Sequence, residues 1–268
     1  MTVFLDNKLC FQAKKRLTTI CCYVALLLSL PVGAHSIVEI VDRVKPSIVG
    51  IGVFDPINAP RANLHGSGFV VADGKHIITN HHVISKPLAE NSRQRRVVFV
   101  GQGKRPITLD ATVVEVDELH DLALLRVERK LEPMKLASAT LIKDGSEIVF
   151  TGFPIGAVLG LYPATHRGII AATTPVIIPA NHSSQLDINT VRRLRDPYYI
   201  YQLDATAYPG NSGSAVYSAD TGEVVAVINK VFVKSTKEAV LSDPSGITYA
   251  IPVKYVLELL KTANVPLN

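Results

Sequence analysis

Three polar residues, spread along the chain, are of the types that nucleophilic acyl transfer requires. Ser212 lies in the run 210–213, where flanking glycines permit a tight turn that exposes a hydroxyl. His82 follows an apolar run that ends at Thr79, and Asp121 opens another apolar run. A serine nucleophile, an imidazole base and a carboxylate that orients the base make up the set that serine acyl transfer uses.

Each of these residues also has an ordinary structural interpretation. The serine could lie in a simple glycine-rich loop, the histidine could be a satisfied structural side chain, and the aspartate could be a solvated residue at a strand start. Together they are more specific, because their order along the chain is His, Asp, Ser. That order is found in chymotrypsin-like enzymes and differs from the orders in subtilisins and α/β-hydrolases.

The pattern around these residues predicts an all-β fold. Short β-branched runs alternate with turn residues, which is typical of a sandwich or a pair of barrels. A capping box, Ser36 with Glu39, predicts a short N-terminal helix with Val38, Val41 and Val44 on its apolar face. A second helix is expected from Pro252 onward. The predicted strands are 47–54, 68–72, 77–79, 97–100, 111–116, 123–127, 147–151, 166–173, 198–203, 214–218, 224–233 and 247–250.

The first 34 residues predict a signal peptide. Three basic residues at 14–16 precede an apolar run, 17–30, that is short for a membrane span, and small residues follow up to Ala34. We expect cleavage after Ala34 and a protease domain over 35–268, with its two barrels meeting near 131–144. A retained membrane anchor is the alternative. Export would leave a mature chain without cysteine, because all three cysteines lie in the first 34 residues.

Charge and metal-ligand patterns exclude some functions. The mature chain keeps 24 basic and 22 acidic residues, a formal net charge of +2, which argues against nucleic-acid binding. His65, His81 and His82 match no standard zinc spacing, so we expect neither a metal ion nor another cofactor.

Five motifs between Gly66 and Pro252 resemble the protease domain of the HtrA/Deg family, and the resemblance covers roughly 38–260. The resemblance implies a chymotrypsin-like double β-barrel with short terminal helices, and endopeptidase activity in protein quality control. No PDZ domain is expected in this chain, and Gly213-Ser214 replaces the family's usual Gly-Gly. The motifs are Gly66-Ser67-Gly68-Phe69-Val70, Thr79-Asn80-His81-His82-Val83, Asp121-Leu122-Ala123-Leu124, Gly210-Asn211-Ser212-Gly213 and Gly246-Ile247-Thr248-Tyr249-Ala250-Ile251-Pro252.

The resemblance also assigns roles to individual residues. It makes His82 the base, because the family's histidine directly precedes a valine, and it makes Asp121 the orienting acid and Ser212 the nucleophile. It places the oxyanion hole at the backbone N–H groups of Gly210 and Ser212, with help from Asn211.

The resemblance places the wall of the substrate pocket before the nucleophile and on a later strand. The residues concerned are Thr206, Ala207, Val227 and Ile228, which are uncharged and predict a preference for small aliphatic P1 residues. Their alternative role is plain core packing.

Three functions are compatible with these features. The first is an exported, periplasmic or secreted endopeptidase that acts on unfolded or exposed polypeptides. The second is a non-catalytic chaperone or peptide-binding module of the same fold, and the third is a processing protease with a single partner. The family resemblance adds a homotrimer formed through residues 37–44.

Overall fold

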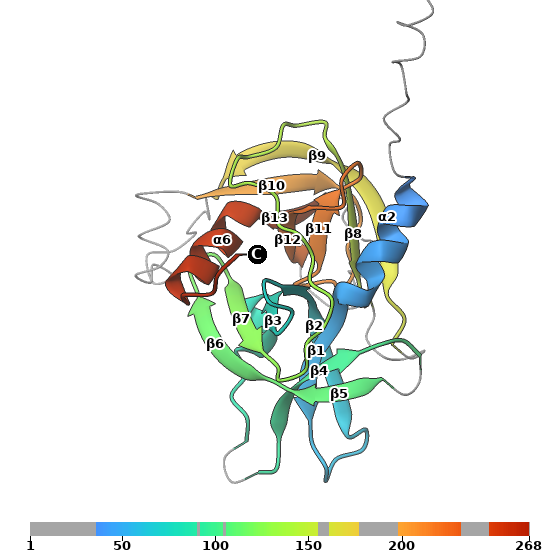
Figure 1. Cartoon of the computed structure of the whole chain (residues 1–268), viewed down its shortest axis with the longest axis vertical. Coiled ribbons are helices and arrows are strands. Elements are labelled where there is room, and N and C mark those ends of the chain that lie inside the picture. Colours follow the sequence, from blue (N-terminus) through green and yellow to red (C-terminus); the bar gives the residue numbers. More distant parts are fainter. Residues whose placement is uncertain are drawn as a thin grey trace, which may run out of the picture. The chain divides into compact units, whose positions relative to one another are not determined.

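The computed structural model describes residues 36–89, 92–103, 106–154, 161–176, 198–231 and 247–267. The expected signal peptide, 1–34, lies outside these residues. Two antiparallel β-sheets, one after the other along the chain, form the body of the described structure (Figure 1). The prediction of a chymotrypsin-like all-β fold is confirmed.

The first sheet has seven strands in the order β5-β4-β1-β2-β3-β7-β6 and forms a half-barrel. Its buried faces carry the β-branched and aromatic residues that gave the sequence its strand pattern. Its strands are β1 (Ile48–Phe54), β2 (Ala62–Val71), β3 (His76–Thr79), β4 (Arg95–Val100), β5 (Ile107–Asp110), β6 (Thr112–Asp117) and β7 (Leu122–Arg126).

The second sheet has six strands and is a closed barrel, because β9 pairs with both β8 and β10. Closure leaves this sheet without a free edge. Residues 127–146 connect it to β7 of the first sheet. Its strands are β8 (Glu147–Gly152), β9 (Ala164–Pro175), β10 (Tyr199–Asp204), β11 (Ala215–Ser218), β12 (Val224–Val231) and β13 (Ile247–Pro252).

Short helices complete the described chain. They are α2 (Ile37–Val44), the 3₁₀ helix η1 (Lys45–Ser47), α3 (His81–Ile84) and α6 (Val253–Thr262). The C-terminal helix α6 contacts β6 and β7 of the first sheet as well as β12 and β13 of the second. Its buried side chains include Val256, Leu259 and Leu260, as the sequence predicts. The largest apolar cluster contains residues of both sheets, α2 and α6, so the two sheets share one core.

Local differences from the sequence prediction have physical reasons. The capping box of α2 is present, and Val41 and Val44 face the core as predicted, but Val38 does not: it is 64% exposed, and Ile40 is fully buried instead. Apolar residues that face a core recur at a mixed spacing of three and four, which selects Ile37, Ile40, Val41 and Val44 rather than a strict spacing of three. Strand β5 escaped prediction because it is a short edge strand with mostly exposed side chains.

Candidate active site

His82 lies on α3, the single helical turn that follows β3. The Asp121 carboxylate holds it at two points. One oxygen accepts a hydrogen bond from the His82 backbone N–H at 2.8 Å, and the other lies 2.6 Å from Nδ1 of the ring. A proton on Nδ1 donates to the carboxylate and leaves Nε2 as the acceptor on the opposite side of the ring. The His82 side chain is 30% exposed, so a substrate or water can reach it.

Asp121 is positioned by its own backbone. It adopts a positive φ of 54°, which aspartate tolerates better than most residues, at the turn between β6 and β7. Its carbonyl accepts hydrogen bonds from the His81 N–H at 3.1 Å and from Asn80 Nδ2 at 3.0 Å. The acid and the histidine turn are therefore bound together through both side chain and backbone.

The Ser212 loop, residues 205–214, connects β10 to β11 of the closed barrel and packs against the first sheet. Gly210 and Gly213 have φ values of +100° and +86°, which explains the glycines that flank the serine. A Cβ on residue 213 would overlap the Ser67 carbonyl and come within 3.2 Å of the Asn80 nitrogen. The loop therefore packs directly against the segment that leads into His82.

The backbone of this loop leaves two donors free. Asn211 N–H donates to the Tyr208 carbonyl, Gly213 N–H to Ile228, and Ser214 N–H to Asn211. Within the described part of the chain, the N–H groups of Gly210 and Ser212 donate to no acceptor. These are the two groups that the sequence predicts for an oxyanion hole.

Asn211, the third residue of that prediction, offers no free backbone N–H. Its backbone N–H is used by Tyr208, and its side chain is fully buried. Its Oδ1 would lie 3.0 Å from a Cβ on Gly152, at the end of β8. The buried Asn211 amide thus lies close to the end of β8.

The Ser212 hydroxyl donates to the Asn229 carbonyl at 3.1 Å. Among the described residues it makes no hydrogen bond to His82, so the structure holds the serine in a conformation turned toward β12. A change of the Ser212 χ1 rotamer is the smallest movement that would redirect this hydroxyl.

A comparison with protein families now adds to this geometry. Residues 66–227, more than half of the chain, match the family described as "Trypsin-like peptidase domain". The chain belongs to the trypsin-like peptidase family.

Relatives and solved structures place this trypsin-like peptidase near HtrA proteases. Serine protease HTRA2, mitochondrial, from Drosophila virilis is 32% identical over 74% of the chain, and its Drosophila grimshawi counterpart is 32% identical over 85%. The chain spans 39% and 47% of the lengths of these two relatives. A structure of a variant of the HtrA-type protease AlgW with a tripeptide superimposes with a TM-score of 0.61 at 26% identity, covering 85% of this chain and 63% of that one.

The four predicted pocket residues of this trypsin-like peptidase do not all face the same way. Ala207 and Ile228 are buried in the apolar cluster inside the closed barrel, and Thr206 is partly exposed. Val227 belongs to the cluster shared by the two sheets, on the opposite face of β12 from Ile228. Because neighbouring strand residues face opposite sides, Val227 cannot line a pocket together with Ile228, which corrects that prediction.

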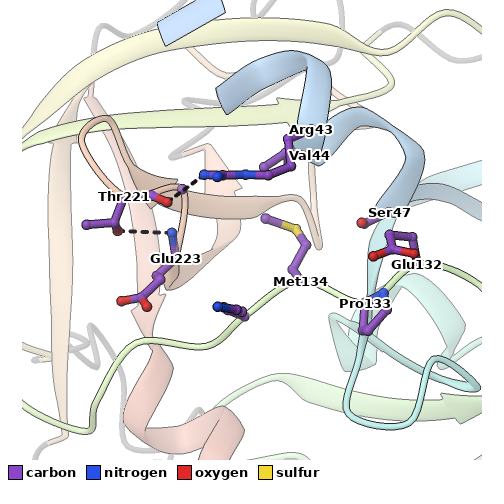
Figure 2. Close-up of a pocket in the computed structure, with 10 residues that line it drawn as sticks. Arg43, Val44, Ser47, Glu132, Pro133, Met134, Thr221 and Glu223 are labelled. Carbon is purple, nitrogen blue, oxygen red and sulfur yellow. Dashed lines mark hydrogen bonds between the residues drawn. The ribbon is translucent and has the colours of Figure 1, made fainter. Parts of the chain in front are cut away.

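Elsewhere the trypsin-like peptidase has a pocket beside α2, shown in Figure 2. Arg43 reaches across it to the Thr221 carbonyl at 2.7 Å, which ties α2 to the turn between β11 and β12. None of the three predicted catalytic residues lines it. The described residues contain no group of three potential metal ligands. None of the described helices is both long and apolar enough to cross a bilayer.

Two contacts of the site were not foreseen from the sequence. Ser67 bonds to the Ser212 loop, and the Asn229 carbonyl accepts the Ser212 hydroxyl. Ser67 lies in one of the five motifs, which was the available signal. The Asn229 contact is made by a carbonyl group, which every residue has, so no residue type could have indicated it.

Proposed function

We propose that this chain is a serine endopeptidase in which Ser212 is the nucleophile, His82 the general base and Asp121 the acid that orients the base. The observation that carries the proposal is the two-point hold of the Asp121 carboxylate on His82, at 2.6 Å and 2.8 Å. The two free N–H groups at Gly210 and Ser212 support it, as does membership of the trypsin-like peptidase family.

The proposed reaction has two halves. Ser212 Oγ leaves the Asn229 carbonyl, gives its proton to His82 Nε2 and attacks the scissile carbonyl carbon, while the N–H groups of Gly210 and Ser212 bind the resulting oxyanion. The protonated His82 then donates that proton to the leaving amine, and an acyl-enzyme remains. Water, deprotonated by His82, hydrolyses the acyl-enzyme and regenerates the serine. Asp121 stays ionised and stabilises the imidazolium in both halves.

The proposed specificity is for small aliphatic P1 residues. Ala207 and Ile228 share one apolar cluster, and Thr206 beside them carries no charge. An uncharged wall of this kind offers no partner to a lysine, arginine or acidic P1 side chain. Discrimination among aliphatic residues by single methylene groups is worth only about 1–3 kcal/mol, so cleavage should be broad.

The proposed setting is the cell envelope, with unfolded or exposed polypeptides as substrates. The basic residues at 14–16, the apolar run after them and the small residues before His35 favour export and cleavage after Ala34. The related HTRA2 proteins are named as mitochondrial, so this compartment is proposed from the chain's own sequence. Assembly as a homotrimer through residues 37–44 belongs to the same proposal.

Digestion of a denatured, fluorescently labelled protein tests the function. The chain from His35 onward should degrade it, and Ser212→Ala should lose that activity while it keeps the same circular dichroism spectrum. Degradation of many denatured proteins favours quality control over a processing role. Equal degradation by both variants would contradict the proposal.

One observation favours a second candidate, a peptide-binding module without turnover. The Ser212 hydroxyl is bonded to Asn229 and not to His82, which describes a resting site. A folded wild-type chain that protects unfolded proteins from aggregation but never cleaves them would establish this alternative.

A further inference from the structure

We infer that Ser67, in the first sheet, is a positioning residue that holds the Ser212 loop in the shape the oxyanion hole requires. The inference rests on the proposed function of the Ser212 site and assigns part of that site to a residue outside the three catalytic side chains. Ser67 lies on β2, 143 residues before Gly210 in the sequence.

Ser67 binds the loop at two places. Its hydroxyl donates to the Gly210 carbonyl at 2.7 Å, and its backbone N–H donates to the Ser212 carbonyl at 2.8 Å. The two acceptors belong to the two residues whose N–H groups stay free. One residue of the first sheet therefore fixes both residues that would bind the oxyanion.

A third contact fixes the direction of the hydroxyl. The N–H of Phe153, just after β8, donates to Ser67 Oγ at 2.9 Å. Serine has a single hydroxyl proton, which points to Gly210, and its oxygen lone pair is used by Phe153. Ser67 and Phe153 are buried, whereas Gly210 is partly exposed. Loss of the hydroxyl would remove the bond to the Gly210 carbonyl and leave the buried Phe153 N–H without this partner.

This arrangement controls the loop because Gly210 has no side chain to restrict it. A glycine at φ +100° can exchange between conformations that other residues cannot reach. The peptide plane that joins Gly210 to Asn211 is held at both ends, by Ser67 at its carbonyl and by Tyr208 at its N–H. Removal of the Ser67 bond frees one end, and the plane can then rotate and turn the neighbouring N–H groups away from the oxyanion.

The test compares Ser67→Ala with a matched control, Thr151→Val. The Thr151 hydroxyl is also fully buried and bonded, to Thr165 and Tyr217 at 3.0 Å and 2.8 Å, but these partners lie outside the Ser212 loop. Each variant is measured with a peptide that the wild type cleaves, for kcat and KM, and with a peptide boronate that forms a tetrahedral adduct. Thermal unfolding of each variant is recorded in parallel.

We expect Ser67→Ala to lower kcat by roughly 10- to 100-fold with KM unchanged, because misplacement of catalytic groups by about 1 Å has effects of that size. Boronate affinity should fall by a similar factor. Thr151→Val should lose comparable stability and keep kcat within about twofold. A normal kcat in Ser67→Ala, or an equal loss of kcat in Thr151→Val, would overturn the inference.

A second variant decides the question if Ser67→Ala does not fold. Ser67→Cys keeps a weak donor at the same position, and we expect it to fold with a kcat below that of the wild type. A folded Ser67→Cys protein with wild-type kcat and boronate affinity would overturn the inference. Failure of the proposed function has a different signature, because the wild type itself would then cleave nothing and bind no boronate.

Discussion

At the scale of single residues, the pairing of Asp121 with His82 has two counterparts that lack a nucleophile, and one of them, Asp117 with His120, also joins the carboxylate to both the backbone N–H and the ring of the histidine. Asp73 and His76 form a similar pair, with Asp73 Oδ1 2.8 Å from His76 Nδ1 and also accepting the Lys75 N–H. The short distance is thus a common local motif of this chain. What distinguishes the Asp121 pair is the Ser212 loop packed against the adjoining segment.

The Asp121–His82 and Asp73–His76 pairs provide a variant and its control. Asp121→Asn should lower kcat by about 10⁴-fold, because an amide that donates to Nδ1 favours the tautomer in which Nε2 carries the proton and cannot act as base. Asp73→Asn should leave kcat within about twofold. Steady-state kinetics on one peptide substrate measures both, and an active Asp121→Asn enzyme would contradict the role given to Asp121.

His166 provides a second prediction at this scale, on stability. Its ring stacks on Phe150 at 4.7 Å, its Nε2 is buried, and within the described residues this atom has no hydrogen-bond partner. Burial lowers the pKa of His166 below its ordinary value of 6.5. As the pH falls below about 6.5, the unfolded chain therefore binds this proton before the folded one, and stability is lost toward acid.

His166→Leu should remove that part of the pH dependence. We expect the urea concentration at the unfolding midpoint to change less between pH 7 and pH 5 than in the wild type. Stability at pH 7 should be equal or greater, because a buried unpaired polar atom costs about 1–3 kcal/mol. Some dependence of stability on pH should remain, because burial and Lys86 also lower the pKa of His65. If the urea midpoint of His166→Leu changes with pH as much as that of the wild type, then His166 does not cause the loss of stability toward acid.

At the scale of elements, α2 is attached by two buried side chains, Ile40 and Val44, and by one hydrogen bond to the second sheet. The Ile40 side chain is fully buried in the core, and Arg43 donates a hydrogen bond to the Thr221 carbonyl. Ile40→Ala should lower the free energy of unfolding by about 2–4 kcal/mol, whereas Val38→Ala, on the exposed side, should change it by less than about 0.5 kcal/mol. Chemical denaturation of both variants measures the difference, and equal losses would contradict the observed face of α2.

The sequence predicted elements better than it predicted contacts. Strand positions and the capping box follow from local patterns of burial and hydrogen bonding, which is why both appear in the structure. The burial of Asn211 and the opposite direction of Val227 depend on how the loop and β12 pack against other elements. Local residue patterns carry no information on those directions, so the sequence could not indicate either of them.

At the scale of the whole described chain, the candidate site exists only where the two sheets meet. His82 and Asp121 come from the first sheet, Ser212 from the closed barrel, and Ser67 binds across between them. The apolar cluster shared by both sheets and α6 holds this junction together. The order of the three residues in the sequence indicated the chemistry, but the packing of the Ser212 loop against the segment before His82 could be seen only in the structure.

The most direct test of the account is covalent labelling of Ser212. The folded chain from His35 onward would be treated with a fluorophosphonate and analysed by intact mass and peptide mapping, beside Ser212→Ala and His82→Ala. We predict one adduct per wild-type chain, located on Ser212, none on Ser212→Ala, and slow labelling of His82→Ala. A folded wild-type protein that forms no adduct, or an adduct that persists in Ser212→Ala, would contradict the assignment of Ser212 as an activated nucleophile.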